Sequence, residues 1–123
     1  MNSPMPGGRT VVFLSHADAD ALRLAASAAL TAAAMGDRVD VFVFGPAVRA
    51  IVDAAGDAGA PGEEDELAML TQARTSGCRL IACSASVVAA RIPLPDAERA
   101  LDAIVGWPTI LEWSRGVVDR FYF

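Results

Sequence analysis

Short apolar runs alternate with longer segments of helical pattern along the whole chain. The runs that predict strands are four to seven residues long and cover residues 10–15, 38–44, 79–83, 101–105 and 120–123. Continuous apolar runs of this length are typical of strands that are buried on both faces of a parallel sheet.

The segments between these runs predict helices over residues 16–35, 47–55, 63–76, 84–90, 96–99 and 108–117. Ser15 or Asp18 is suited to cap the first helix, and Gly36 is suited to end it. Because strands and helices alternate, we expect right-handed crossovers and a mainly parallel five-stranded sheet between two helical layers. The predicted fold class is therefore α/β, with three α/β/α layers.

The ends of the chain and its hydropathy define the expected organisation. Residues 1–9 hold two prolines and two glycines without an apolar run, so we expect a flexible tail followed by a single domain over residues 10–123. This tail does not resemble a secretory signal, and the longest weakly polar stretch, residues 24–35, is too short to span a bilayer. We expect a cytoplasmic protein with no membrane span.

Charge and composition exclude several classes of function. The net charge is −5, and the ten basic residues are all arginines that form no stripe, so binding to nucleic acid is not expected. The absence of lysine removes Schiff-base chemistry and the P-loop lysine. A single histidine rules out a histidine-rich metal site, and no strand is followed by the glycine fingerprint of dinucleotide binding. We therefore predict no metal and no cofactor.

The two cysteines, Cys78 and Cys83, lie five positions apart. On one strand this odd spacing points them to opposite faces, roughly 16 Å apart along the strand. A disulfide requires Cα atoms within about 7 Å, so we expect two free thiols and a reducing compartment.

Cys83 is the strongest candidate for a functional residue. It ends a predicted strand and precedes a predicted helix, and functional groups gather at the carboxyl ends of strands in open α/β sheets. Free amides at a helix start favour a thiolate, and Ser84 and Ser86 add hydroxyl groups. The alternative is that Cys83 is a small apolar residue in the core, which is also the interpretation we prefer for Cys78.

His16 follows the first predicted strand. It could serve as a base or an anion donor beside Cys83 if the first and third strands are neighbours. Otherwise it is an exposed loop histidine.

The C-terminal third of the chain is rich in aromatic residues for so small a protein, namely Trp107, Trp113, Phe121, Tyr122 and Phe123. An exposed cluster of this kind usually marks an interface. We therefore expect a homo-oligomer, with a trimer favoured over a hexamer or a dimer.

The order of three segments, residues 32–44, 77–86 and 103–123, resembles the DsrE/DsrF-like family, which includes TusD-type sulfur-relay subunits. The resemblance implies a flavodoxin-like fold that assembles as trimers or hexamers. It also implies that the cysteine after the third strand, here Cys83, carries sulfane sulfur as a persulfide. Members of the family often have glycine at the position of Arg91, where an arginine could hold an anion or block a partner.

Three hypotheses follow. The first is a persulfide carrier, or sulfurtransferase, that receives sulfur on Cys83 from one protein and passes it to another. The second is a non-catalytic oligomeric or regulatory module in which Cys83 only packs. A thiol-dependent peroxide reductase is disfavoured, because Cys78 is badly placed to resolve an oxidised Cys83.

Overall fold

The computed structural model describes residues 8–56, 66–117 and 119–123. Its strands are β1 (Arg9–Leu14), β2 (Arg38–Val43), β3 (Arg79–Cys83), β4 (Ala103–Val105) and β5 (Asp119–Tyr122). Its helices are α1 (Ala19–Ala34), α2 (Pro46–Gly56), α3 (Glu66–Thr75), α4 (Ser84–Ala89), α5 (Leu94–Ala100) and α6 (Trp107–Trp113). Most of the predicted tail and the start of the predicted helix over residues 63–76 lie outside the described residues.

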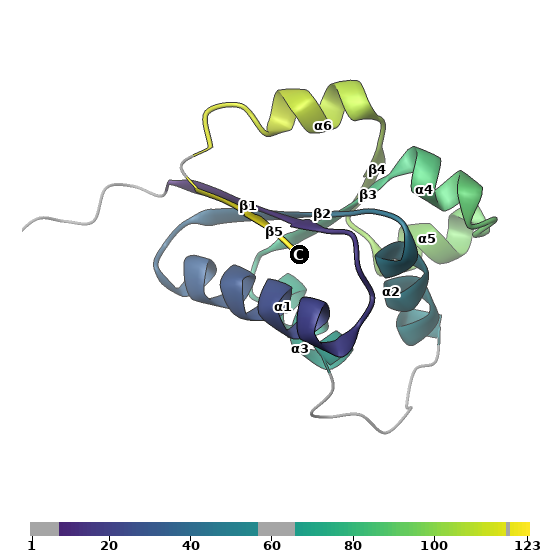
Figure 1. Cartoon of the computed structure of the whole chain (residues 1–123), viewed down its shortest axis with the longest axis horizontal. Helices are drawn as coiled ribbons and strands as arrows, with labels where there is room; N and C mark the ends of the chain where they lie inside the picture. Colours follow the sequence, from purple (N-terminus) through teal and green to yellow (C-terminus); the bar gives the residue numbers. More distant parts are fainter. Residues whose placement is uncertain (1–7, 57–65, 118) are drawn as a thin grey trace, which may run out of the picture.

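The strands form one parallel sheet in the order β4-β3-β2-β1-β5. Helices lie on both faces of this sheet (Figure 1), which confirms the predicted three-layer, flavodoxin-like α/β fold. No helix of the described part is long and apolar enough to cross a bilayer.

The handedness of the connections explains how the helices are shared between the two faces. From β1 to β4 each connection moves in one direction across the sheet, so right-handed crossovers place α1, α2, α3 and α5 on the same face. The connection from β4 to β5 runs back across the whole sheet, and the same rule sends α6 to the opposite face. Figure 1 shows α6 by itself on that side.

Two apolar clusters correspond to these two faces. The larger one lies under α1, α2, α3 and α5, where Ala25, Ala26 and Ala29 are fully buried and let α1 lie close to the sheet. The smaller one lies under α6, and its buried members are Val11, Phe42, Ile81, Cys83 and Ile110. Successive side chains of a strand point to opposite faces, which is why Val11 and Val12 belong to different clusters.

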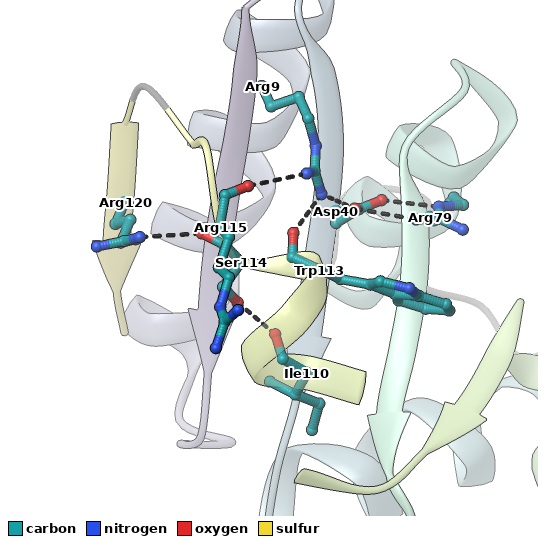
Figure 2. A network of polar contacts seen from close by, with 8 residues as sticks. All are labelled: Arg9, Asp40, Arg79, Ile110, Trp113, Ser114, Arg115 and Arg120. Atoms are coloured by element: carbon teal, nitrogen blue, oxygen red, sulfur yellow. Dashed lines mark hydrogen bonds and ion pairs between the residues drawn. The ribbon is translucent and has the colours of Figure 1, made fainter. Parts of the chain in front are cut away.

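A network of charged groups holds the end of α6 against the sheet (Figure 2). Asp40 on β2 accepts hydrogen bonds from Arg9 on β1, at 3.2 Å, and from Arg79 on β3, at 2.8 and 3.0 Å. Arg9 also donates to the carbonyl oxygens of Trp113 and, at 3.2 Å, of Arg115. Arg9 therefore links a buried carboxylate of the sheet to the last turn of the helix.

Arg79 contributes to the same anchor through its guanidinium group. The group lies over the ring of Trp113, 4.9 Å from its centre, in a cation–π contact. The pKa of Arg79 is raised above its ordinary value, chiefly by its hydrogen bond to Asp40. At the middle of α6, Ile110 is 1% exposed and packs into the sheet.

Several predicted boundaries were wrong by a few residues. The first helix begins at Ala19 and not at His16, because Asp18 is its cap and accepts from the amide of Ala21 at 3.1 Å. The predicted strand at residues 101–105 begins only at Ala103, because α5 is longer than the predicted turn and the Leu101 amide bonds back to Ala97.

The helix predicted over residues 108–117 ends at Trp113. Ser114 is its cap, and Gly116 has a φ of +70°, a left-handed conformation that turns the chain towards β5.

We expect Asp40→Asn to lower the free energy of unfolding by about 1 to 3 kcal/mol, because two arginines then lose the charged acceptor that they share. Urea denaturation measures this change. Asp20→Asn is the matched control: it removes an exposed pair with Arg23 and should change stability by less than about 1 kcal/mol. Equal effects of the two substitutions would show that the network does not anchor the fold.

Candidate functional site

Cys83 ends β3 and is the residue from which α4 begins, with an extended backbone at φ −70° and ψ 124°. Its side chain is 3% exposed and lies on the face of the sheet that α6 covers. It borders a cavity of about 420 Å³ whose other lining residues are Phe44, Gly45, Pro46, Arg49, Ala85, Ser86, Ala89, Ala90 and Trp107.

This cavity forms where β2 and β3, which are parallel neighbours, both end. After β2 the chain turns at Gly45, whose φ of +52° belongs to the left-handed region that glycine adopts without strain. The Gly45 amide donates to Ser86 Oγ at 2.9 Å. Ser86 thus ties the turn before α2 to α4 and fixes the two walls of the cavity around Cys83.

The sequence prediction missed Arg49, the charged residue of this cavity. Arg49 lies on α2, one turn after Pro46, and donates a hydrogen bond to the carbonyl oxygen of Ala90 at the end of α4. Its ion pair with Asp53, at 3.8 Å, is exposed on both sides. Pro46 and Arg49 lie one turn apart on the same face of α2, but only the packing of α2 beside β3 and α4 brings this face to the cavity, so the sequence pattern alone did not identify Arg49.

Arg91, in contrast, does not line the cavity. It is exposed, and its φ of +55° makes it the one residue other than glycine with a positive φ among those described. This left-handed turn ends α4, and a glycine would adopt it without strain. The conformation gives a physical reason for the glycine that the family resemblance led us to expect at this position.

The structure does not bring His16 to Cys83. Strand β2 lies between β1 and β3, so the condition on which that prediction depended is not met. His16 is exposed, and its Nδ1 lies 3.3 Å from Ser15 Oγ. Ser84 is half-buried beside Gly106 and does not line the cavity either.

Cys78 lies on the other face of the sheet, where it is 2% exposed and its thiol donates to the carbonyl oxygen of Ala29 at 3.6 Å. Burial raises the pKa of the Cys78 thiol, and the negative charge of Asp40 raises it further. The thiol is therefore protonated at neutral pH and a poor nucleophile. Both cysteines are free, as expected, and belong to different clusters.

Metal binding has no support in the part of the chain that the structure describes. There, no three histidine, cysteine, aspartate or glutamate residues come together in a group that could hold an ion.

The site thus belongs to a three-layer α/β protein with a free cysteine at the carboxyl end of an inner strand. The sequence profile of the DsrE/DsrF-like family matches residues 9–114, so the chain belongs to the DsrE/DsrF-like family.

Among solved structures, the fold is similar to that of a protein of unknown function, MTH1491 from Methanobacterium thermoautotrophicum. The TM-score is 0.69 at 18% sequence identity, over 92% of this chain and 98% of that chain. No curated protein sequence matches the chain.

We expect Arg91→Gly to be at least as stable as the wild type, because relief of a left-handed strain of about 1 kcal/mol offsets the greater freedom of glycine in the unfolded chain. Arg91→Val keeps the strain and adds a β-branched side chain, so it should be less stable than Arg91→Gly by about 1 kcal/mol or more. Thermal denaturation compares the two variants. A clear loss of stability in Arg91→Gly would mean that the arginine side chain makes a stabilising contact.

Proposed function

We propose that this protein is a persulfide carrier of the cytoplasm that accepts sulfane sulfur on Cys83 and passes it to a second protein. The observation that carries the proposal is the contrast between the two thiols. Cys83 borders a cavity with a cationic side chain, whereas Cys78 is enclosed in the opposite core with a raised pKa. Membership in the DsrE/DsrF-like family supports the same assignment.

The transfer is balanced without an external oxidant or reductant. The Cys83 thiolate attacks the terminal sulfur of a donor persulfide, a new S–S bond forms on Cys83, and the S–S bond of the donor breaks. The donor leaves as a thiolate and takes up a proton. In the second step a thiolate of the acceptor attacks the terminal sulfur on Cys83 and regenerates the free cysteine.

Arg49 supplies the positive charge for a persulfide anion in this cavity. The amides at the start of α4 add less, because α4 is only six residues long and has a correspondingly small dipole. Arg49 also forms an ion pair with Asp53, but the side chains of Arg49 and Asp53 are 48% and 64% exposed, so this pair holds the guanidinium weakly. The guanidinium also donates to the carbonyl oxygen of Ala90, and its remaining N–H groups are available to the anion.

The position of Cys83 limits the kind of partner. Cys83 is 3% exposed, and a persulfide extends its side chain by only about 2 Å into the cavity that Phe44 and Trp107 also line. We infer that the donor and the acceptor present a cysteine on a narrow or flexible segment that enters the cavity. In this account the protein transfers a group between proteins and is not a hydrolase or an oxidoreductase.

One observation favours a second candidate, a non-catalytic oligomeric module. Cys83 is buried under α6 in one apolar cluster with Phe42 and Ile81, which is where a cysteine with only a packing role would lie. In this alternative the cavity beside Cys83 has no reactive role.

We expect the reduced protein to gain the mass of one sulfur atom when it is incubated with polysulfide, or with a cysteine desulfurase and cysteine. A reductant should remove the added sulfur. Cys78→Ser should load like the wild type, whereas Cys83→Ser should remain folded and fail to load, because serine is nearly isosteric but forms no persulfide. Intact-mass spectrometry with a circular dichroism control measures both properties.

Loading of Cys78 in the native protein would refute the site assignment. Absence of loading with every donor, or unfolding of Cys83→Ser, would favour the packing module.

We also propose that the protein is a homo-oligomer, most simply a trimer, that associates through the open edge of β5. All four residues of this edge strand are exposed, and Phe121 is 42% exposed with its ring stacked on Phe123. Unpaired edges and exposed aromatic residues together favour association.

Sedimentation velocity at micromolar concentration should show a trimer for the wild type and a smaller species for Phe121→Glu. Leu94→Glu, which changes a residue that is 55% exposed on α5, should leave the trimer intact. A monomeric wild type would contradict the proposal, as would dissociation of Leu94→Glu alone.

A further inference from the structure

A second and larger cavity, of about 730 Å³, lies on the α6 side of the sheet, between α6 and β5. Its lining comes from the ends of β1 and β2, from β5 and from α6, and consists of Phe13, Ser15, Phe44, Trp107, Ile110, Leu111, Ser114, Arg115, Arg120 and Tyr122. It exists because a single helix covers this face of the sheet and leaves β1 and β5 partly bare.

One end of this groove is built of aromatic rings. Tyr122 lies against Phe13, with ring centres 4.8 Å apart and planes 7° apart. The row continues from Phe13 to Phe44 at 6.2 Å and from Phe44 to Trp107 at 5.2 Å. The two ends of the row are open to water, since Trp107 is 51% and Tyr122 is 69% exposed. Leu111, which is 58% exposed, adds a further open apolar side chain to the groove.

The other end of the groove is cationic. Arg120 pairs in register with Val11, two positions before Tyr122, so its side chain is on the same face roughly 7 Å further along the strand. Figure 2 shows Arg115 and Arg120 on the side of α6 that faces β5, opposite to Arg79.

Neither Arg115 nor Arg120 forms an ion pair with a described residue, although most arginines of this acidic chain do. Arg120 donates to the carbonyl oxygen of Ser114 at 2.9 Å, and no carboxylate side chain is among the lining residues. Two arginines without an acidic partner at one end of an apolar groove match a single anionic group on a ligand.

The place of the groove in the sheet agrees with a ligand site. It lies over β1, which has β2 on one side and β5 on the other and is the strand at which the strand order reverses. Open α/β sheets bind ligands at such reversal points, at the carboxyl ends of the strands. Phe13 and Tyr122 stand near those ends of β1 and β5.

We propose that this groove binds a small aromatic carboxylate, with its ring system against the Tyr122–Phe13–Phe44–Trp107 row and its carboxylate on Arg115 and Arg120. Cys83 is not among the lining residues of this groove, although Phe44 and Trp107 line both cavities. The proposal does not depend on sulfur transfer. It also does not use Phe121, which points to the other face of β5.

The test is isothermal titration calorimetry of the full chain with 2-naphthoate, and with 2-naphthamide as an uncharged ligand of the same shape. We expect saturable binding of one naphthoate per chain and binding of the amide that is at least about tenfold weaker, because the amide loses the charge-assisted hydrogen bonds. The doubly substituted Arg115→Gln/Arg120→Gln protein should lose that preference for the anion and bind both ligands alike.

Two variants keep the test independent of folding. Arg115→Gln alone removes an exposed guanidinium without touching the bond of Arg120 to Ser114, and it should still weaken naphthoate binding severalfold. Arg38→Gln is the matched control, since Arg38 is exposed and lies outside the groove, and it should change nothing.

Four results would overturn the proposal. Three are no saturable binding of naphthoate, equal affinity for the acid and the amide in the wild type, and an effect of Arg38→Gln as large as that of Arg115→Gln. The fourth is a change in oligomeric state in Leu111→Glu, because it would assign the groove to a second copy of the chain.

Discussion

The right-handedness of parallel crossovers is the constraint on which the rest of this structure depends. Four helices must share one face of the sheet, and the single connection that runs back, from β4 to β5, supplies the only described helix of the other face. One short helix cannot cover five strands. The uncovered area becomes two cavities, one beside Cys83 and one over β1 and β5, and Phe44 and Trp107 line both of them. Both candidate sites are therefore consequences of the strand order.

The arginine–aspartate network stabilises the layer that α6 forms by itself. With few apolar contacts under α6, the buried carboxylate of Asp40 and the guanidinium groups of Arg9 and Arg79 fix the last turn of the helix at the amino ends of the strands. Trp107, at the other end of α6, is then positioned over the carboxyl ends, where Cys83 lies. The charged network around Asp40 and the candidate reactive residue Cys83 thus lie at opposite ends of the strands, on the same face of the sheet.

The sequence predicted the layers, the five strands and the opposite placement of Cys78 and Cys83, because buried strands and the two-residue period of a strand are local signals. It could not predict which strands are neighbours, so the contact of His16 with Cys83 depended on β1 lying next to β3. The structure places β2 between these two strands, and the contact does not form. Arg49 was missed because its role arises from the packing of α2 against α4, and the pairing of Arg9 with Asp40 joins residues 31 positions apart. Helix ends were misplaced where a cap, such as Asp18, overrode an apolar pattern.

The rate of alkylation of each cysteine in the native protein is the most direct test of the central claim, that Cys83 is a reactive thiol on an accessible cavity and Cys78 is not. Iodoacetamide labelling is followed by peptide mass spectrometry at several urea concentrations below the unfolding transition. The account predicts that Cys83 reacts at a rate that urea barely changes, whereas Cys78 reacts only through unfolding and accelerates with urea. If both rates rise together with urea, Cys83 is a packing residue of the core and the claim fails.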